Sequence, residues 1–269
     1  MTRKSAHAGR TALVTGASAG IGEQLARCFA AGGFDLVLVA RSADKLRALA
    51  AVLQTAHGRE VHAIAADLSR PGAAEALAAK LERQGLVVDV LVNNAGVLEQ
   101  GAFCDIAPAR HQELVALNVA GLTAMLAEFL PGMRERGWGR VLNVASIAAF
   151  QPVPSLATYA ATKAYVLSLT EALSEELKGS GVTLTALCPG VTATPMVSRA
   201  TDANQKLNQL PGFMIGNAAQ VAAEGYQACL RGEVIRVPGF VNLAGTLAAR
   251  ATPKWLLRSL GGLVARRSL

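Results

Sequence analysis

Residues 11–22 read TALVTGASAGIG, an apolar run followed by glycines at positions 16, 20 and 22. The run has the length and composition of a buried β-strand, and the residues from Ile21 onward have the apolar spacing of a helix. Glycines in a turn between strand and helix let the backbone approach a pyrophosphate, whose charge the helix amide groups attract. The spacing is G-x-x-x-G-x-G and not the commoner G-x-G-x-x-G. Tight packing of the strand on the helix is the alternative interpretation.

The rest of the chain continues this alternation of strand and helix patterns. Continuously apolar strands must be covered on both faces, so the pattern predicts an α/β fold. We expect a doubly wound, Rossmann-like parallel sheet of about seven strands with helices on both faces. The predicted strands are Thr11–Thr15, Phe34–Ala40, Val61–Ala65, Val87–Val92, Arg140–Ala145, Val182–Leu187 and Val234–Val237. The predicted helices are Ile21–Ala31, Ala43–Thr55, Ala73–Arg83, Pro108–Arg136, Thr158–Lys178 and Ala218–Arg231.

The domain organisation follows from the length of the chain and from the lack of repeats and linkers. The 269 residues contain no repeat of fixed period and no Pro-, Gly- or Ser-rich linker. We therefore predict one dinucleotide-binding catalytic domain over residues 1–249. Its irregular segment 191–217 follows the carboxyl end of a predicted strand, where α/β sheets bind ligands, and is predicted to be a substrate loop.

The positive charge is concentrated near the C-terminus. The net charge is +7, and residues 234–269 contribute six Lys and Arg without any Asp or Glu. A near-neutral body with 4% aromatic residues argues against a nucleic-acid partner. Residues 250–269 are predicted to be a basic amphipathic extension whose helix starts at Thr252–Pro253. We expect it to pack on protein, with peripheral contact to an anionic membrane as the alternative. Its apolar stripe would comprise Leu256, Leu257, Leu260, Leu263 and Val264.

The cysteines and the N-terminus indicate the compartment. The four cysteines are far apart, without a C-x-x-C pair or a histidine at ligand spacing, so neither a metal site nor a disulfide framework is expected. Residues 1–10 contain cations but no apolar segment behind them, so no secretory signal is expected. We therefore predict a cytoplasmic location, with membrane-peripheral association through residues 250–269 as the alternative.

Arg41 bears on the choice of cofactor. It ends the second predicted strand, where dinucleotide-binding domains often place an acidic residue on the ribose 2'-hydroxyl. A guanidinium binds a 2'-phosphate through charge-assisted hydrogen bonds, whereas a carboxylate would repel it. The sequence therefore favours NADP(H) over NAD(H). The alternative is a solvated surface arginine, with Asp44 or a displaced residue serving the ribose.

Tyr159 and Lys163 are four residues apart and therefore lie on one face of a predicted helix. A phenol with an ordinary pKa of about 10 is a poor acid–base catalyst at neutral pH, and a cation one turn away would stabilise its phenolate. A surface pair on an amphipathic helix is the alternative. A serine hydrolase is disfavoured, because no histidine lies near Ser146 and the surrounding sequence is not a G-x-S-x-G elbow.

Together these elements resemble the short-chain dehydrogenase/reductase family over about residues 10–192. The resemblance implies that Tyr159 is the general acid that protonates a carbonyl oxygen and that Ser146 hydrogen-bonds the same oxygen. It implies that Lys163 lowers the pKa of the tyrosine and holds the nicotinamide ribose, and that Asn118 positions a water in the proton relay. The residues that carry the resemblance, in order, are Thr15–Gly22, Asp67–Leu68, Asn93–Gly96, Asn118, Ser146, Tyr159, Lys163, Pro189–Gly190 and Thr192.

The same resemblance implies contacts with the cofactor. Asp67 would lie near the adenine, Asn93 and Gly96 along the cofactor, and Thr192 at the nicotinamide amide. A turn role for Asp67 and a sheet-stabilising role for Asn93 and Asn94 are the alternatives. The predicted cofactor-binding residues are Gly16, Ser18, Gly20, Ile21, Gly22, Arg41, Asp67, Leu68, Asn94, Ala95, Gly96, Tyr159, Lys163, Pro189, Gly190 and Thr192.

The predicted function is that of an NADPH-dependent oxidoreductase, acting without a metal and expected to be a homodimer or homotetramer. It would transfer a hydride between the nicotinamide and an apolar ketone, aldehyde or secondary alcohol. The close alternative is a reductase of 3-oxoacyl groups on an acyl carrier or coenzyme A. An alternative of another class is a binding protein that senses NADP(H), against which the full set of catalytic residues argues. The apolar substrate is suggested by Phe150, Val153, Leu156, Met196, Leu210, Phe213 and Met214 in segments 147–156 and 193–216.

Overall fold

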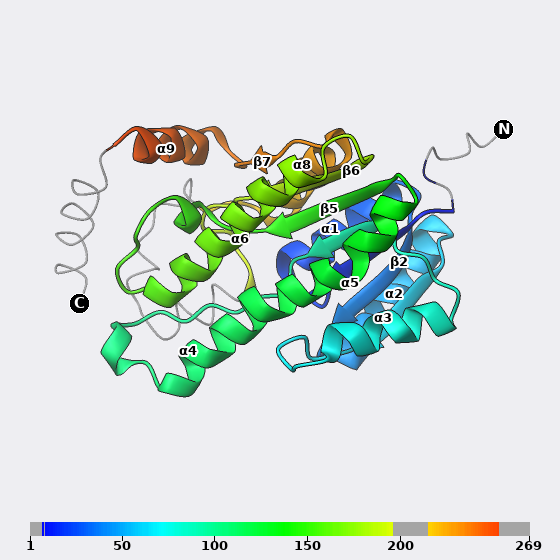
Figure 1. The fold of residues 1–269 in the computed structure, drawn as a ribbon. Coiled ribbons are helices and arrows are strands. Elements are labelled where there is room, and N and C mark those ends of the chain that lie inside the picture. Colours follow the sequence, from blue (N-terminus) through cyan, green and yellow to red (C-terminus); the bar gives the residue numbers. More distant parts are fainter. Residues whose placement is uncertain (1–6, 8, 196–214, 253–269) are drawn as a thin grey trace.

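A seven-stranded parallel sheet forms the centre of the molecule (Figure 1), as seen in a computed structural model that describes residues 7, 9–195 and 215–252. The strand order is β3-β2-β1-β4-β5-β6-β7. The chain adds β2 and β3 on one side of β1 and then continues with β4 on the other side, so the order of the strands reverses between β1 and β4. This arrangement confirms the predicted doubly wound, Rossmann-like fold. The strands are β1 Thr11–Thr15, β2 Asp35–Ala40, β3 Val61–Ala65, β4 Val90–Asn93, β5 Gly139–Val144, β6 Val182–Leu187 and β7 Ile235–Arg236.

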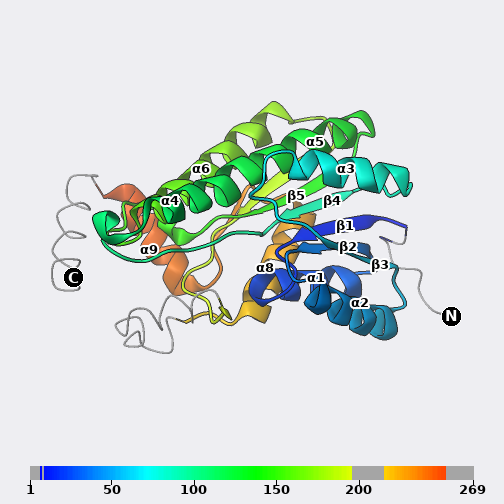
Figure 2. The same cartoon turned by 90° about the horizontal axis from the view of Figure 1, so that it is seen from below.

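Helices cover both faces of the sheet, as Figure 2 shows from below. One face carries α1 (Gly20–Ala31), α2 (Ala43–His57) and α8 (Ala218–Arg231). The other carries α3 (Ala73–Arg83), α4 (Pro108–Val115), α5 (Leu122–Glu135) and α6 (Ala157–Glu176). Two short 3-10 turns, η1 (Phe103–Asp105) and η3 (Ile147–Phe150), lie in loops, and α9 (Phe240–Ala251) follows β7.

The two hydrophobic cores explain why the strands read as unbroken apolar runs. In β1, Leu13 belongs to the core on the α3–α6 side, while its neighbours Ala12 and Val14 belong to the core under α1 and α2. Leu13 is paired in register with Val37 of β2 and Leu91 of β4, which face the same side. Successive side chains of a strand point to opposite faces of the sheet. When helices cover both faces, the odd and the even positions of the strand must therefore both be apolar.

The long predicted helix Pro108–Arg136 contains an irregularity that the sequence pattern does not reveal. A π-helical turn, η2 (Ala116–Gly121), joins α4 to α5. A side chain at Gly121 would overlap the carbonyl oxygen of Leu68, so the helix approaches the loop after β3 closely at this point. Among the described helices, the run Pro108–Glu135 is long and apolar enough to cross a membrane by length and mean hydropathy (1.6). Its residues Leu122, Met125, Leu126 and Leu130 belong to the core.

A further helix, α9, lies at the C-terminal end of the described residues. The sequence pattern missed α9, and the boundary predicted between residues 249 and 250 falls inside this helix. The helix predicted to start at Thr252–Pro253 lies outside the described residues. Thr252 itself ends α9, with extended backbone angles (φ −88°, ψ 133°). The reason is Pro253, since the residue before a proline is pushed out of the helical region. The remaining extension 253–269 and the loop residues 196–214 lie outside the described residues, with the apolar side chains predicted there.

Candidate active site

A cavity of about 700 Å³ opens at the carboxyl edge of the sheet, where the strand order reverses. This is the edge at which α/β sheets bind ligands. Most of the predicted site residues line it, although they come from loops after six different strands. The predicted residues that line the cavity are Gly16, Ser18, Gly20, Ile21, Arg41, Asp67, Leu68, Asn94, Ala95, Gly96, Ser146, Tyr159, Lys163, Pro189, Gly190 and Thr192.

The glycine-rich turn forms the floor of one part of this cavity. Gly16 and Gly20 have φ values of +66° and +62°, which side chains disfavour. A Cβ on Gly16 would lie 2.7 Å from the Nδ2 atom of Asn94. Gly22 does not line the cavity, but a side chain there would overlap the Gly16 carbonyl oxygen. Ala19 at the N-cap of α1 makes no side-chain capping bond, so amide groups of the first helical turn are left for a ligand.

The segment after β4 is tied to the end of β1. The backbone N–H groups of Asn94 and Ala95 both donate to Thr15 Oγ1 at 3.0 Å, and Asn94 Nδ2 donates to the Thr15 carbonyl oxygen at 2.9 Å. Asn93, by contrast, is buried and does not line the cavity. Its Nδ2 donates to Asn143 Oδ1 at 3.0 Å within the sheet. The contact expected between Asn93 and a cofactor is therefore replaced by a sheet-stabilising role.

Ser146 and Tyr159 meet at the other end of the cavity. Ser146 caps η3 by accepting a hydrogen bond from the backbone N–H of Ala148 at 3.1 Å. Burial raises the pKa of Tyr159, and a hydrogen bond with Ser146 opposes this only in part. Burial therefore determines the direction of the shift in this structure, and a lowering of the Tyr159 pKa by Lys163 stays a prediction. Burial in low dielectric disfavours the phenolate, and helical spacing gives no information on burial.

Lys163 is buried below this pair, with 6% of its surface exposed. Its Nζ atom donates to the carbonyl oxygen of Val144 at 2.8 Å and lies 5.7 Å from the centre of the Tyr159 ring. Burial lowers the pKa of Lys163 from 10.5 to about 8, because the charged form loses hydration. At neutral pH the ammonium and the phenol are therefore both protonated.

Replacing Lys163 with Met is expected to change the stability in a pH-dependent way. Between about pH 8 and 10.5 the unfolded lysine binds more protons than the folded one, so wild-type stability rises with pH over this window. The cost of burying the charge is present below about pH 8. We therefore expect the free energy of unfolding of Lys163→Met, relative to wild type, to be higher at pH 7 than at pH 10 by up to about 3 kcal/mol.

Urea unfolding of both proteins at pH 7 and pH 10 measures this difference. Lys80→Met, which changes an exposed lysine on α3, is the matched control and should give the same difference at both pH values. Loss of the hydrogen bond to Val144 adds an offset that does not depend on pH. A difference for Lys163→Met that stays constant between the two pH values would contradict the prediction.

Asn118 lies in the π turn, is 1% exposed and does not line the cavity. Its Oδ1 accepts from the Val97 N–H, and its Nδ2 donates to the Val97 carbonyl oxygen, both at 2.9 Å. Nδ2 also donates to Thr162 Oγ1 at 3.1 Å. The side chain thereby fixes the segment after β4 to α6. A water-positioning role in catalysis stays a prediction.

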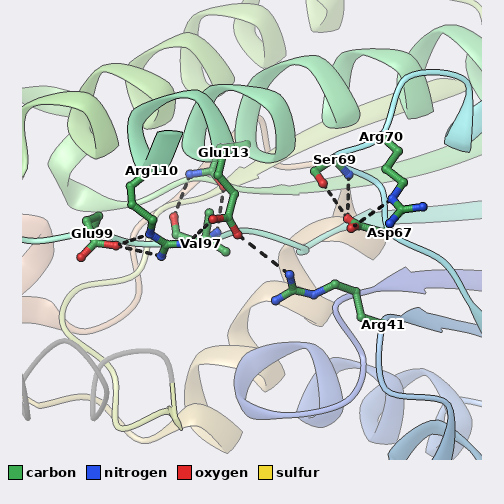
Figure 3. Close-up of polar contacts among 9 residues, drawn as sticks. Arg41, Asp67, Ser69, Arg70, Val97, Glu99, Arg110 and Glu113 are labelled. Carbon is green, nitrogen blue, oxygen red and sulfur yellow. Dashed lines mark hydrogen bonds and ion pairs between the residues drawn. The ribbon is translucent and has the colours of Figure 1, made fainter. Parts of the chain in front are cut away.

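Charged residues gather at the opposite end, around Arg41 (Figure 3). Asp67 Oδ1 accepts hydrogen bonds from the Ser69 backbone N–H at 3.1 Å and hydroxyl at 2.7 Å. These bonds, together with the charges of Arg41 and Arg70, lower the pKa of Asp67 despite partial burial. Asp67 thus combines the predicted cavity position with the alternative turn role.

The structure adds residues that sequence reasoning missed. Lys45 lines the cavity with Arg41 and Ser42 and supplies a second cation. The spacing of Arg41 and Lys45 around the start of α2 was a usable signal for a phosphate site. Of the segments expected on the substrate side, Thr194 and Pro195 line the cavity, whereas residues 147–156 do not. The reason is that η3 packs Ile147 and Phe150 against the core.

Comparison with known proteins places the chain in a family. The family model described as short chain dehydrogenase matches residues 10–205. The 2-(R)-hydroxypropyl-CoM dehydrogenase of Xanthobacter autotrophicus is 35% identical over 221 residues, covering 79% of this chain and 88% of that protein. The chain belongs to the short-chain dehydrogenase/reductase family, whose members are oxidoreductases that act on alcohol and ketone groups with nicotinamide cofactors.

Solved structures agree with this assignment. A short-chain dehydrogenase from Sphingobium yanoikuyae in complex with NADPH superposes with a TM-score of 0.80 at 33% identity, covering 95% of each chain. A 3-oxoacyl (acyl-carrier-protein) reductase from Agrobacterium tumefaciens with NADP bound gives a TM-score of 0.77 at 28% identity, covering 87% of this chain and 95% of that one.

The cavity fits a nicotinamide dinucleotide. Its volume of about 700 Å³ is in the usual range for ligand sites. The turn at Gly16–Gly22 leaves space that Cβ atoms would fill and presents a helix N-terminus to a pyrophosphate. Polar side chains suited to a ribose or phosphate lie at one end, and a protonated phenol with a lysine lies at the other.

Proposed function

We propose that the protein is an NADPH-dependent reductase of apolar ketones or aldehydes, or a dehydrogenase of the corresponding secondary alcohols. One observation carries the proposal: Ser146, Tyr159 and Lys163 line the same cavity as the glycine-rich turn and the Arg41–Lys45 cation pair. The chemistry of proton transfer and the recognition of a phosphorylated nucleotide are thus combined in one site.

The residues at the catalytic end suit reduction near neutral pH. The bound cofactor would supply a hydride to the carbonyl carbon. Tyr159, kept protonated by burial, would donate its proton to the carbonyl oxygen, completing an alcohol. Ser146 would donate a hydrogen bond to the same oxygen and hold it toward the phenol. Lys163 would keep its position through Val144 and bind a ribose hydroxyl.

Cofactor choice is proposed to depend on Arg41. Its side chain lies with Ser42 and Lys45 at the adenosine end, and these donors suit the 2'-phosphate of NADP(H). The NADPH complex of the Sphingobium relative supports this choice.

Arg41→Ala is expected to weaken NADPH binding about 10- to 100-fold, because a charged hydrogen bond to phosphate is lost. NADH binding should change less than about two-fold, since that cofactor has no 2'-phosphate. Fluorescence titration with each cofactor measures both constants. Equal losses for NADPH and NADH would contradict a role for Arg41 in recognising the phosphate.

The substrate is proposed to be apolar because the segment beside the catalytic residues is apolar. Gly96 is close to Lys163, with 3.6 Å between a Cβ there and Nζ, and Val97 and Leu98 follow it along the cavity wall. The likeness to the Agrobacterium 3-oxoacyl reductase favours one second candidate, a 3-oxoacyl thioester on an acyl carrier or coenzyme A.

Oxidation of NADPH and NADH by the purified protein, tested against ketones, aldehydes and 3-oxoacyl thioesters, distinguishes these possibilities. Turnover of simple ketones and aldehydes with NADPH is the expected result. Preference for carrier-linked substrates would favour the second candidate. Tight NADPH binding without turnover of any substrate would favour a binding protein that senses the nucleotide.

A further inference from the structure

Glu113 of α4 lies opposite Arg41 at the adenosine end of the cavity (Figure 3). The Glu113 Oε1 and Arg41 Nη1 atoms are 3.9 Å apart. Arg41 lies between β2 and α2, whereas Glu113 belongs to α4, and α2 and α4 cover opposite faces of the sheet. Leu117, one turn further along this helix run, lines the cavity itself.

A second arginine keeps the Glu113 carboxylate in place. Arg110, one turn earlier on α4, forms an ion pair with Glu113 Oε2. Arg110 is in turn held by Glu99, whose Oε2 accepts a hydrogen bond from Nε at 2.8 Å and forms an ion pair with Nη2 at 2.8 Å. These carboxylates raise the pKa of Arg110, chiefly through the hydrogen bond from Arg110 to Glu99. The Glu113 side chain is 30% exposed, whereas that of Arg41 is 62% exposed.

We propose that Glu113 is a specificity-determining residue that weakens the preference for NADP(H) by competing with the 2'-phosphate for Arg41. The proposal rests on the proposed use of NADP(H). A 2'-phosphate bound by Arg41 brings negative charge toward a carboxylate that Arg110 holds in place. NAD(H) has a hydroxyl at this position and meets no such repulsion. Glu113 therefore acts against one cofactor and leaves the other almost unaffected.

The other carboxylates near Arg41 interact mainly with other partners. Asp67 is turned toward its own loop by Ser69 and lies 3.7 Å from Arg70 Nε. Asp44 forms an ion pair with Arg47 on α2. Lys45 adds a cation on the Arg41 side of the cavity. Among the described residues, Glu113 is the carboxylate that forms an ion pair with Arg41, so Glu113→Gln removes this contact and leaves the weaker charge interaction with Asp67 in place.

The test is the ratio of dissociation constants for NADH and NADPH in Glu113→Gln, measured by titration of the full-length protein. We expect NADPH to bind about three- to ten-fold more tightly than in wild type and NADH to change less than about two-fold. 2',5'-ADP and 5'-AMP, which differ only in the 2'-phosphate, should show the same contrast. A structural effect on α4 would instead change the dissociation constants of both cofactors by the same factor.

Glu99→Gln is the matched control, because it removes the other carboxylate on Arg110 without touching Arg41. It should leave the ratio unchanged. An unchanged ratio in Glu113→Gln, or an equal change in Glu99→Gln, would overturn the proposal. Arg41→Ala separates this failure from failure of the proposed cofactor: if that variant binds NADPH as wild type does, the cofactor assignment itself is wrong.

Discussion

Tyr159→Phe is expected to lower carbonyl reduction about 10²- to 10⁴-fold while changing the dissociation constant of NADPH less than about two-fold. The variant removes one oxygen atom and keeps the aromatic ring that packs beside Lys163. Turnover falls because no group donates the proton, whereas the glycine-rich turn and Arg41 are untouched. Steady-state kinetics with the best substrate of the panel, together with NADPH titration, measures both quantities.

Tyr165→Phe is the matched control on the same helix. Its hydroxyl forms a 2.9 Å hydrogen bond with Thr123 Oγ1, and its side chain is exposed rather than in the cavity. It should keep wild-type kinetics. Turnover by Tyr159→Phe at more than about a tenth of the wild-type rate would contradict the proposal that Tyr159 donates the proton to the carbonyl oxygen.

Gly22→Ala is expected to lower the free energy of unfolding by about 3 kcal/mol and to abolish tight NADPH binding. The added methyl group would overlap the Gly16 carbonyl oxygen and the Asn94 side chain, both of which the ends of β1 and β4 hold in place. Relief would require α1 to move away from the turn that forms the floor of the cavity. For a protein of this size the loss corresponds to a fall in Tm of roughly 6–12 °C.

Thermal unfolding with and without NADPH measures this effect. Gly245→Ala is the control, since no heavy atom lies within 4 Å of a Cβ at this position of α9. Alanine there should be neutral or slightly stabilising, as expected for an exposed helical site. The prediction would be contradicted if Gly22→Ala unfolded at the same temperature as Gly245→Ala and were stabilised by NADPH as much as wild type.

The strands and helices could be predicted because a sheet that is buried on both faces requires unbroken apolar runs, which are visible in the sequence. β1, β3 and β6 begin and end where the apolar runs do. The start of β4 is later than predicted, at Val90, and the preceding Asp89 carboxylate accepts a hydrogen bond from the Thr11 N–H. Such a contact joins residues far apart in the chain and has no local signature.

Most of the predicted site residues line one cavity, but the sequence did not indicate their interactions. The sequence places Arg41 after β2, yet its ion pair with Glu113 depends on the packing of two helical layers. The direction of the Tyr159 pKa shift depends on burial, which the spacing to Lys163 does not report. Likewise, Asn118 was identifiable, whereas its contacts to Val97 and Thr162 required the π turn.

The π turn also affects how substitutions in the long helix should be planned. Each residue of an α-helix advances by about 100°, so a helical wheel drawn from Pro108 to Glu135 as one continuous repeat loses its phase at Ala116–Gly121. Faces assigned on α4 cannot be extended to α5 by counting. Engineers who wish to redesign the outer face should number each half from its own buried residues, Leu114 before the turn and Leu122, Met125 and Leu126 after it.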